Sequence, residues 1–144
     1  MLYGFTVVLK NKSVQNEEQI YAGKLINVVG TMKTIGIDET TTLQKWHAGK
    51  IEDGAASVQF ANFKSQRQTL DDDFFSRAAP KRFAQVHQTF GDANTLYMQA
   101  DDLYRDGTFR RNADLISNGD AKAAAAKNKF DSALSQLEKL GYKL

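Results

Sequence analysis

The clearest pattern in the chain is a heptad repeat of apolar residues in its first quarter. Apolar residues recur every seven positions without a break, at Val7, Val14, Tyr21, Val28 and Ile35. In the second half of this stretch Leu25 and Met32 lie between them, so that the spacing alternates between three and four. This spacing places one apolar stripe along a helix and is typical of a helix that packs lengthwise against others. We therefore expect a helix over Val7 to Ile35.

The two halves of this helix differ. Asn11 and Glu18 occupy the positions that correspond to Leu25 and Met32, so the N-terminal half lacks interleaved apolar residues. The C-terminal half is expected to be buried, and the N-terminal half to be partly exposed or to meet a partner. Gly36 is expected to end the helix, and the β-branched residues 40–42 to form a break.

A second helical stripe follows. Leu43, Trp46 and Ile51 open this region, and its regular part has apolar residues at Ala56, Phe60, Phe63, Leu70 and Phe74. Pro80 is the sole proline, and it disfavours a helix at the residue before it while suiting the first turn of a new one. A break is therefore expected over residues 76–79.

The third stripe runs from Phe83 to Tyr104 with spacings of three and four throughout, and Gly107 is expected to cap it. Residues 108–117 are expected to form a short helix, followed by a turn at Asn118-Gly119. Asp120 then suits the start of a last helix, which Gly141 would end.

Four main helices with short connections predict an all-α fold, an antiparallel four-helix bundle that forms one domain over residues 1–144. Period-2 alternation, the mark of strands, appears nowhere convincingly. A chain of 144 residues can bury a core without staples, and its 42% hydrophobic content supplies one.

Composition removes several classes of function. Without cysteine, disulfides, thiolate metal sites and a cysteine nucleophile are excluded. No window approaches the roughly 20 apolar residues of a membrane span. The apolar start, residues 1–9, is open to two interpretations: the first turns of a helix or a strand, or the end of a membrane anchor or signal segment that has been removed.

No catalytic, metal or cofactor motif is present. His47 and His87 are far apart without ligand spacing, and nucleophile elbows, phosphate loops and dinucleotide fingerprints are absent. We therefore expect a protein that is not an enzyme and uses no metal or cofactor. A net charge of +2, with basic residues expected at opposite ends of the third helix, also argues against nucleic acid as a partner.

Arg67 falls on the apolar stripe of the second helix, where a charge is costly unless it is paired. One interpretation places it at the edge of the stripe, with its stem packed and its head in water. The other is an anion or carboxylate site between helices, in which Tyr97, Tyr104 or Trp46 supplies the apolar walls. The candidate ligand-binding residues are therefore Arg67, Tyr97, Tyr104 and Trp46, with a small anionic ligand.

The chain resembles the extracytoplasmic four-helix-bundle sensor domains of bacterial chemoreceptors. The resemblance rests on size, four long amphipathic helices, the lack of cysteine and an apolar segment leading into the Val7 to Ile35 helix. It implies a non-enzymatic bundle that senses or binds a ligand or partner outside the cytoplasm, with a self-dimer through the first helix and contact with a membrane only through a missing anchor. The alternative is a small adaptor, chaperone or structural protein, cytoplasmic, that binds another protein through a helical face.

Overall fold

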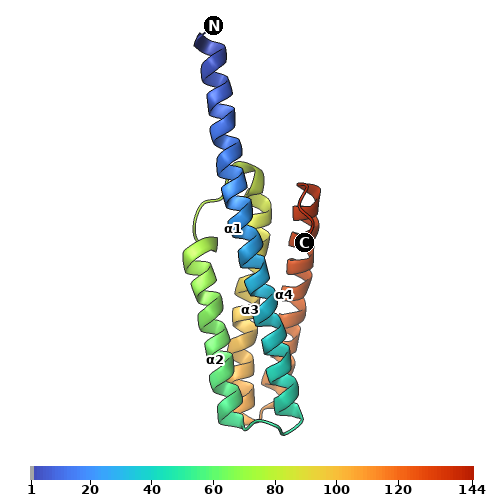
Figure 1. The fold of residues 1–144 in the computed structure, drawn as a ribbon. Coiled ribbons are helices and arrows are strands. Elements are labelled where there is room, and N and C mark those ends of the chain that lie inside the picture. Colours follow the sequence, from blue (N-terminus) through green and yellow to red (C-terminus); the bar gives the residue numbers. More distant parts are fainter. Residues whose placement is uncertain (1) are drawn as a thin grey trace.

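Four long helices lie side by side in an antiparallel bundle (Figure 1). The computed structural model describes the backbone of residues 2–144 and the side chains of residues 13–144. The helices are α1 (Leu2–His47), α2 (Asp53–Leu70), α3 (Ala84–Arg110) and α4 (Ala113–Lys139). A π-helical turn, Asp71–Phe75, extends α2, and a 3-10 turn, Lys81–Phe83, precedes α3. The described residues contain no strand, and the prediction of an all-α four-helix bundle is confirmed.

The apolar stripe of α1 is buried from Tyr21 onward. Tyr21, Leu25 and Ile35 belong to the core, whereas Val14 is 46% exposed. Figure 1 shows why, since the first turns of α1 project beyond the other three helices. The expected difference between the two halves of this helix is thus confirmed for the described side chains. Those of Val7 and Asn11, and the apolar start over residues 1–9, lie outside them.

The predicted end of the first helix at Gly36 is wrong. α1 continues to His47, and the turn follows at Gly49, whose φ of +70° suits glycine. The threonines expected to break the helix are accommodated within it, because the Thr40 hydroxyl donates to the Gly36 carbonyl at 3.0 Å. The Thr42 hydroxyl instead donates to Gln59 of α2 at 2.8 Å and joins the two helices.

The break between α2 and α3 lies where it was predicted, over residues 76–79. His87 holds it in place from α3, with Nε2 3.1 Å from the Phe75 carbonyl and Nδ1 2.7 Å from the Tyr21 hydroxyl. A neutral ring with its proton on Nε2 satisfies both contacts, since it donates to the carbonyl and accepts from the hydroxyl. His87 is therefore accounted for as a structural residue.

The boundary between α3 and α4 differs from the prediction. Gly107 lies inside α3, which ends at Arg110, and Arg111 takes the left-handed conformation with a φ of 49°. Asn112 caps α4, since its side chain accepts from the backbone N–H groups of residues 114 and 115. The separate short helix over residues 108–117 is wrong, because its first residues belong to α3 and its last to α4. The turn at Asn118-Gly119 and the start at Asp120 are wrong as well, because α4 runs through them without a break. The predicted end at Gly141 is confirmed, with a φ of +98°.

Gly107 and Gly119, which were predicted to lie in a helix cap and in a turn, are contact points between α3 and α4. A Cβ atom at Gly119 would lie 2.8 Å from Cε1 of Tyr104, and one at Gly107 would lie 2.7 Å from Cδ1 of Ile116. Tyr104 cannot move aside freely, because its buried ring is anchored by a 2.6 Å hydrogen bond from its hydroxyl to Asp120. Glycine is therefore present at Gly119 for close helix packing and not for a turn.

We expect Gly119→Ala to destabilise the fold by about 1–3 kcal/mol, the usual cost of overpacking. The matched control is Gly54→Ala in α2, where an added Cβ meets nothing within 4 Å. That substitution should stabilise by about 0.5–1 kcal/mol, because alanine is the better helix former. Urea unfolding of both variants measures the difference, and a stabilising effect at Gly119 would contradict the packing role.

Candidate functional site

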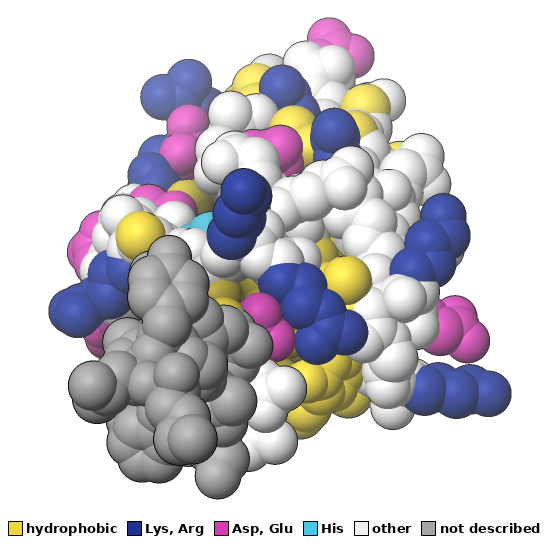
Figure 2. Space-filling model, turned by 90° about the horizontal axis from the view of Figure 1, so that it is seen from above, with side chains coloured by type: hydrophobic (Ala, Val, Ile, Leu, Met, Phe, Trp, Pro, Cys, Tyr) yellow, Lys and Arg dark blue, Asp and Glu magenta, His cyan; other side chains and the backbone are white. Residues whose placement is uncertain are grey.

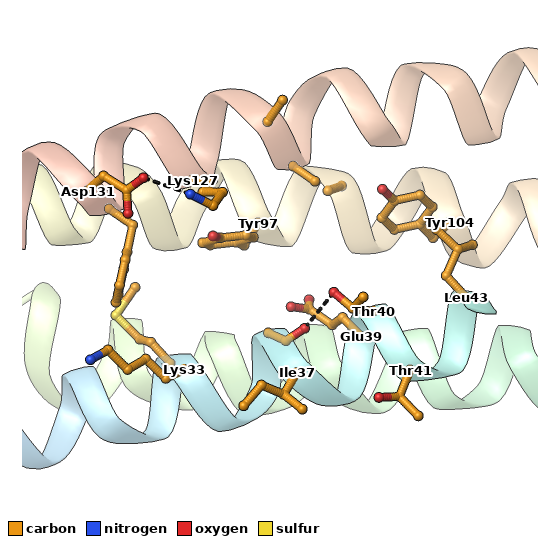
Figure 3. A pocket seen from close by; sticks show the side chains of 16 residues that line it. Lys33, Ile37, Glu39, Thr40, Thr41, Leu43, Tyr97, Tyr104, Lys127 and Asp131 are labelled. Carbon is orange, nitrogen blue, oxygen red and sulfur yellow. Dashed lines mark hydrogen bonds and ion pairs between the residues drawn. The ribbon is translucent and has the colours of Figure 1, made fainter. Parts of the chain in front are cut away.

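A cavity of about 670 Å³ lies between α1 and α4, with α3 behind it (Figure 3). It exists because α3 packs closely against α2 and α4, whereas α1 has α2 and not α4 as its close neighbour. Small side chains on α4 at Ala123 and Ala124 leave the space open. The lining residues are Met32, Lys33, Gly36, Ile37, Glu39, Thr40, Thr41 and Leu43 of α1, Tyr97, Ala100 and Tyr104 of α3, and Ala123, Ala124, Lys127, Phe130 and Asp131 of α4.

The lining of this pocket is mostly apolar, with charges near its rim. Lys127 and Asp131 form an ion pair on α4 at 2.8 Å, and both side chains are more than half exposed. Lys33 is exposed on α1, and Ile37 beside it is 66% exposed. The rim is thus polar, while the interior suits an apolar molecule.

Glu39 is a buried acid in the wall of the pocket. Its residue is 8% exposed, and its carboxylate is bound by Arg67 of α2 in a bidentate arrangement. Nε of Arg67 donates to Oε2 at 3.1 Å, and Nη2 donates to Oε1. Two parallel hydrogen bonds of this kind compensate part of the cost of burying both charges. The guanidinium of Arg67 is fully buried. Arg67 therefore lies inside the bundle, and the interpretation that places it at the edge of the stripe with its head in water is wrong.

Asp101 of α3 is a second carboxyl group beside the same guanidinium. It is fully buried, and its Oδ2 lies 3.6 Å from Nε of Arg67, beyond a direct hydrogen bond. Neither of its oxygens has a described donor as partner. Burial is the main cause that raises the pKa of Asp101 to about 10, and the nearby carboxylate of Glu39 raises it further, although Arg67 opposes the shift. Asp101 is therefore protonated at neutral pH, beside the carboxylate of Glu39.

Tyr97 and Asn94 complete the cluster from α3. The Tyr97 ring lies against the guanidinium of Arg67, whose central carbon is 4.1 Å from the ring centre. The Asn94 amide donates to the Arg67 backbone carbonyl at 2.9 Å. Burial also raises the pKa of Tyr97. Figure 3 shows Glu39 pointing from α1 toward Tyr97, so the cluster borders the pocket where these two side chains meet.

The structure brings three of the four predicted ligand-binding residues to this region. Tyr97 and Tyr104 line the pocket, and Arg67 adjoins it through its contacts with Glu39 and Tyr97. Trp46 lies apart, near the end of α1, where its indole N–H donates to Asp53 at 2.9 Å. Arg111 binds the other oxygen of Asp53, and both contacts lower the pKa of this carboxyl group. Trp46 thus takes part in the contact, through Asp53, between the α1–α2 loop and the α3–α4 loop.

Sequence reasoning missed Glu39, although a signal was present. Glu39 follows Leu25 and Met32 at intervals of seven, and so it is a charged residue on the apolar stripe of α1. The prediction that the first helix ends at Gly36 left Glu39 outside that stripe. A continuous helix would have placed two opposite charges, Glu39 and Arg67, on the apolar faces of neighbouring helices, which is the arrangement that predicts a buried ion pair.

Metal sites and nucleic-acid interfaces find little support in the described part of the chain. Over residues 13–144 no group of three or more histidine, aspartate or glutamate residues could hold a metal ion. The basic residues near Pro80 and those near Gly107 lie at opposite ends of α3 (Figure 1). On the end from which α1 projects, Lys and Arg side chains are spread out with acidic ones between them (Figure 2).

Comparisons with protein-family models, with curated proteins and with solved structures gave no match. The likeness to chemoreceptor sensor domains therefore rests on the helical architecture alone. Among the described residues, no helix has the length and hydropathy needed to cross a membrane.

Proposed function

We propose that this protein is a non-enzymatic ligand-binding bundle of the sensor type, and that its ligand enters the pocket between α1 and α4. The observation that carries the proposal is the pocket itself. Its volume of about 670 Å³ falls within the range of small-molecule sites, and its lining combines apolar walls with one buried acid, Glu39. The extracytoplasmic location expected from the resemblance forms part of this proposal.

The position of the pocket supports a sensing role. A ligand there would contact both α1 and α4, which otherwise do not pack closely. Binding would shift the equilibrium toward the spacing of α1 and α4 that the ligand binds more tightly. The size of the shift is set by the difference between the ligand's affinities for the two spacings. Because α1 projects beyond the bundle, a shift of this helix would be passed to whatever lies at its projecting end (Figure 1).

Ala124→Phe tests the proposal by filling the pocket. Both Ala124 and its neighbour Ala125 are exposed, but only Ala124 lines the pocket, so Ala125→Phe is a control with the same change in helix propensity. We expect the affinity for the neutral dye Nile red, measured by fluorescence titration, to fall at least tenfold in Ala124→Phe and to stay unchanged in the control. Equal affinity in both variants would show that the dye does not bind in this pocket.

A second candidate function is self-association through α1, supported by a separate observation. Gly23, Ile26 and Gly30 recur at spacings of three and four on an exposed face of this helix, and Lys33 and Ile37, which also line the rim of the pocket, continue the same spacing. All five are exposed, and a Cβ atom at either glycine would meet nothing within 4 Å. The two glycines on either side of Ile26 allow two helices to approach closely, and the same face on a second copy of the chain would match it.

Ile26→Lys, compared with Val58→Lys on α2, tests this second candidate. Both substitutions add a charge at an exposed apolar position. We expect sedimentation equilibrium to show a dimer for the unchanged chain and for Val58→Lys, and a monomer for Ile26→Lys. A monomer in all three cases at high protein concentration would exclude the dimer.

A further inference from the structure

We propose that the ligand of the α1–α4 pocket has a cationic amine at its polar end, and that this amine binds against Glu39. The inference rests on the proposed ligand-binding function and adds the charge of the ligand. Its first support is the balance of charged groups beside the pocket. Two carboxyl groups, Glu39 and Asp101, face a single guanidinium, that of Arg67. When both carboxyl groups are ionised, the cluster has one negative charge more than its own cation can neutralise.

Glu39 can accept further hydrogen bonds from the pocket. Its two carboxylate oxygens offer about four acceptor positions, and Arg67 uses one on each oxygen. Of the two carboxyl groups, only Glu39 lines the pocket, while Asp101 is fully buried behind it. An ammonium group, with three N–H donors and no acceptor, matches a carboxylate in a pocket wall that has acceptor positions left over.

The aromatic walls near Glu39 also suit a cation. Tyr97 and Tyr104 line the pocket on the side of α3, and Glu39 points toward Tyr97 (Figure 3). The Tyr97 ring already lies against one cation, since the Arg67 guanidinium is 4.1 Å from its centre. Tyrosine rings attract ammonium groups as well as guanidinium groups. The apolar part of the ligand would then pack along Met32 and Phe130.

The charged groups around Glu39 on α2, α3 and α4 are consistent with this sign, and Lys33 of α1 opposes it only from the exposed rim. Arg67 of α2 is bound to Glu39, and Asp101 of α3 is its second carboxyl neighbour. On α4, Lys127 is paired with Asp131 and adds no net charge to the pocket. Lys33 on α1 is the cation without a described acidic partner, and it is exposed at the rim, where solvent screens it.

A bound ammonium changes the protonation of the cluster. In the empty pocket Asp101 holds a proton. If it were ionised, it would add a second buried negative charge to that of Glu39, and the cluster has only one guanidinium to compensate both. An ammonium beside Glu39 supplies the missing positive charge, so Asp101 can release its proton to solvent as the amine binds. The amine should then bind more tightly as the pH rises, until the amine itself loses its proton. A neutral ligand should show no such dependence.

A matched series of ligands tests the charge. We would titrate the full chain by calorimetry with 4-phenylbutylamine, 4-phenylbutanol and 4-phenylbutanoate, which share a shape and differ in charge. We expect the amine to bind at least tenfold more tightly than the alcohol, and the acid more weakly than either. Equal binding of all three, or tightest binding of the acid, would overturn the cationic ligand while leaving the pocket in place. Binding of none would overturn the proposed function as well.

Asp101→Asn tests the proton release. Asparagine has the shape of a protonated aspartate but cannot lose a proton at this position. Between pH 6 and pH 9, the affinity of the unchanged chain for 4-phenylbutylamine should rise at least tenfold, and that of Asp101→Asn should stay constant. Circular dichroism confirms that the variant is folded. An affinity that rises equally in both chains would contradict the role of Asp101.

Discussion

Arg67→Met is expected to destabilise the bundle by about 3–5 kcal/mol, the cost of leaving a buried charge without its partner. Glu39 loses both of its guanidinium hydrogen bonds, and Tyr97 loses the cation against its ring. Methionine fills much of the space of the arginine stem, so the loss reports the charge more than a cavity.

Arg105→Met is the matched control for this substitution. Arg105 also lies within a helix and binds two carboxylates, Asp102 and Asp106, each at 3.1 Å, but its side chain is 37% exposed. Exposed ion pairs contribute at most about 1 kcal/mol. Urea unfolding should therefore separate the two variants clearly. Similar losses at both positions would mean that the buried cluster contributes no more than a surface ion pair.

Asp101→Asn is expected to become increasingly more stable than the unchanged chain as the pH rises. The pKa of Asp101 is about 10 in the folded protein, whereas that of an exposed aspartate carboxyl group is 3.8. Between these values the folded state binds a proton that the unfolded state lacks, so the stability of the unchanged chain falls as the pH rises. The limit for one group is about 1.4 kcal/mol per pH unit. Asparagine removes this dependence.

The measurement is the free energy of unfolding of both chains between pH 4.5 and pH 9. The two values should lie closest together at the acidic end, because pH 4.5 is less than one unit above the unfolded-state pKa of 3.8 and the proton linkage has acted over only that short range. They should diverge steadily toward pH 9 in favour of Asp101→Asn. Parallel curves would show that Asp101 is ionised in the folded protein, contrary to its position beside Glu39.

Arg67 illustrates how far a sequence leads toward a site. Its place on an apolar stripe predicted either a partner or a path to water, and the structure provides the partner. That partner lies 28 residues earlier in the chain, beyond a glycine that local reasoning took for a helix end. The second carboxyl group, Asp101, carries no unusual signal in the sequence, since an aspartate beside another aspartate is ordinary on a helix surface. Its burial follows only from the rotation of α3 within the bundle.

The sequence by itself determined the class of fold and the stripes along which the helices pack, because the period of apolar residues depends only on the geometry of a helix. It also located the α2–α3 break and the final glycine, where proline and a positive φ act locally. Only the tertiary structure decided the remaining helix ends, since Gly36, Gly107 and Gly119 can serve a turn or a helix interior equally well. The pocket was decided in the same way, because it results from the separation of α1 and α4, which no local pattern specifies.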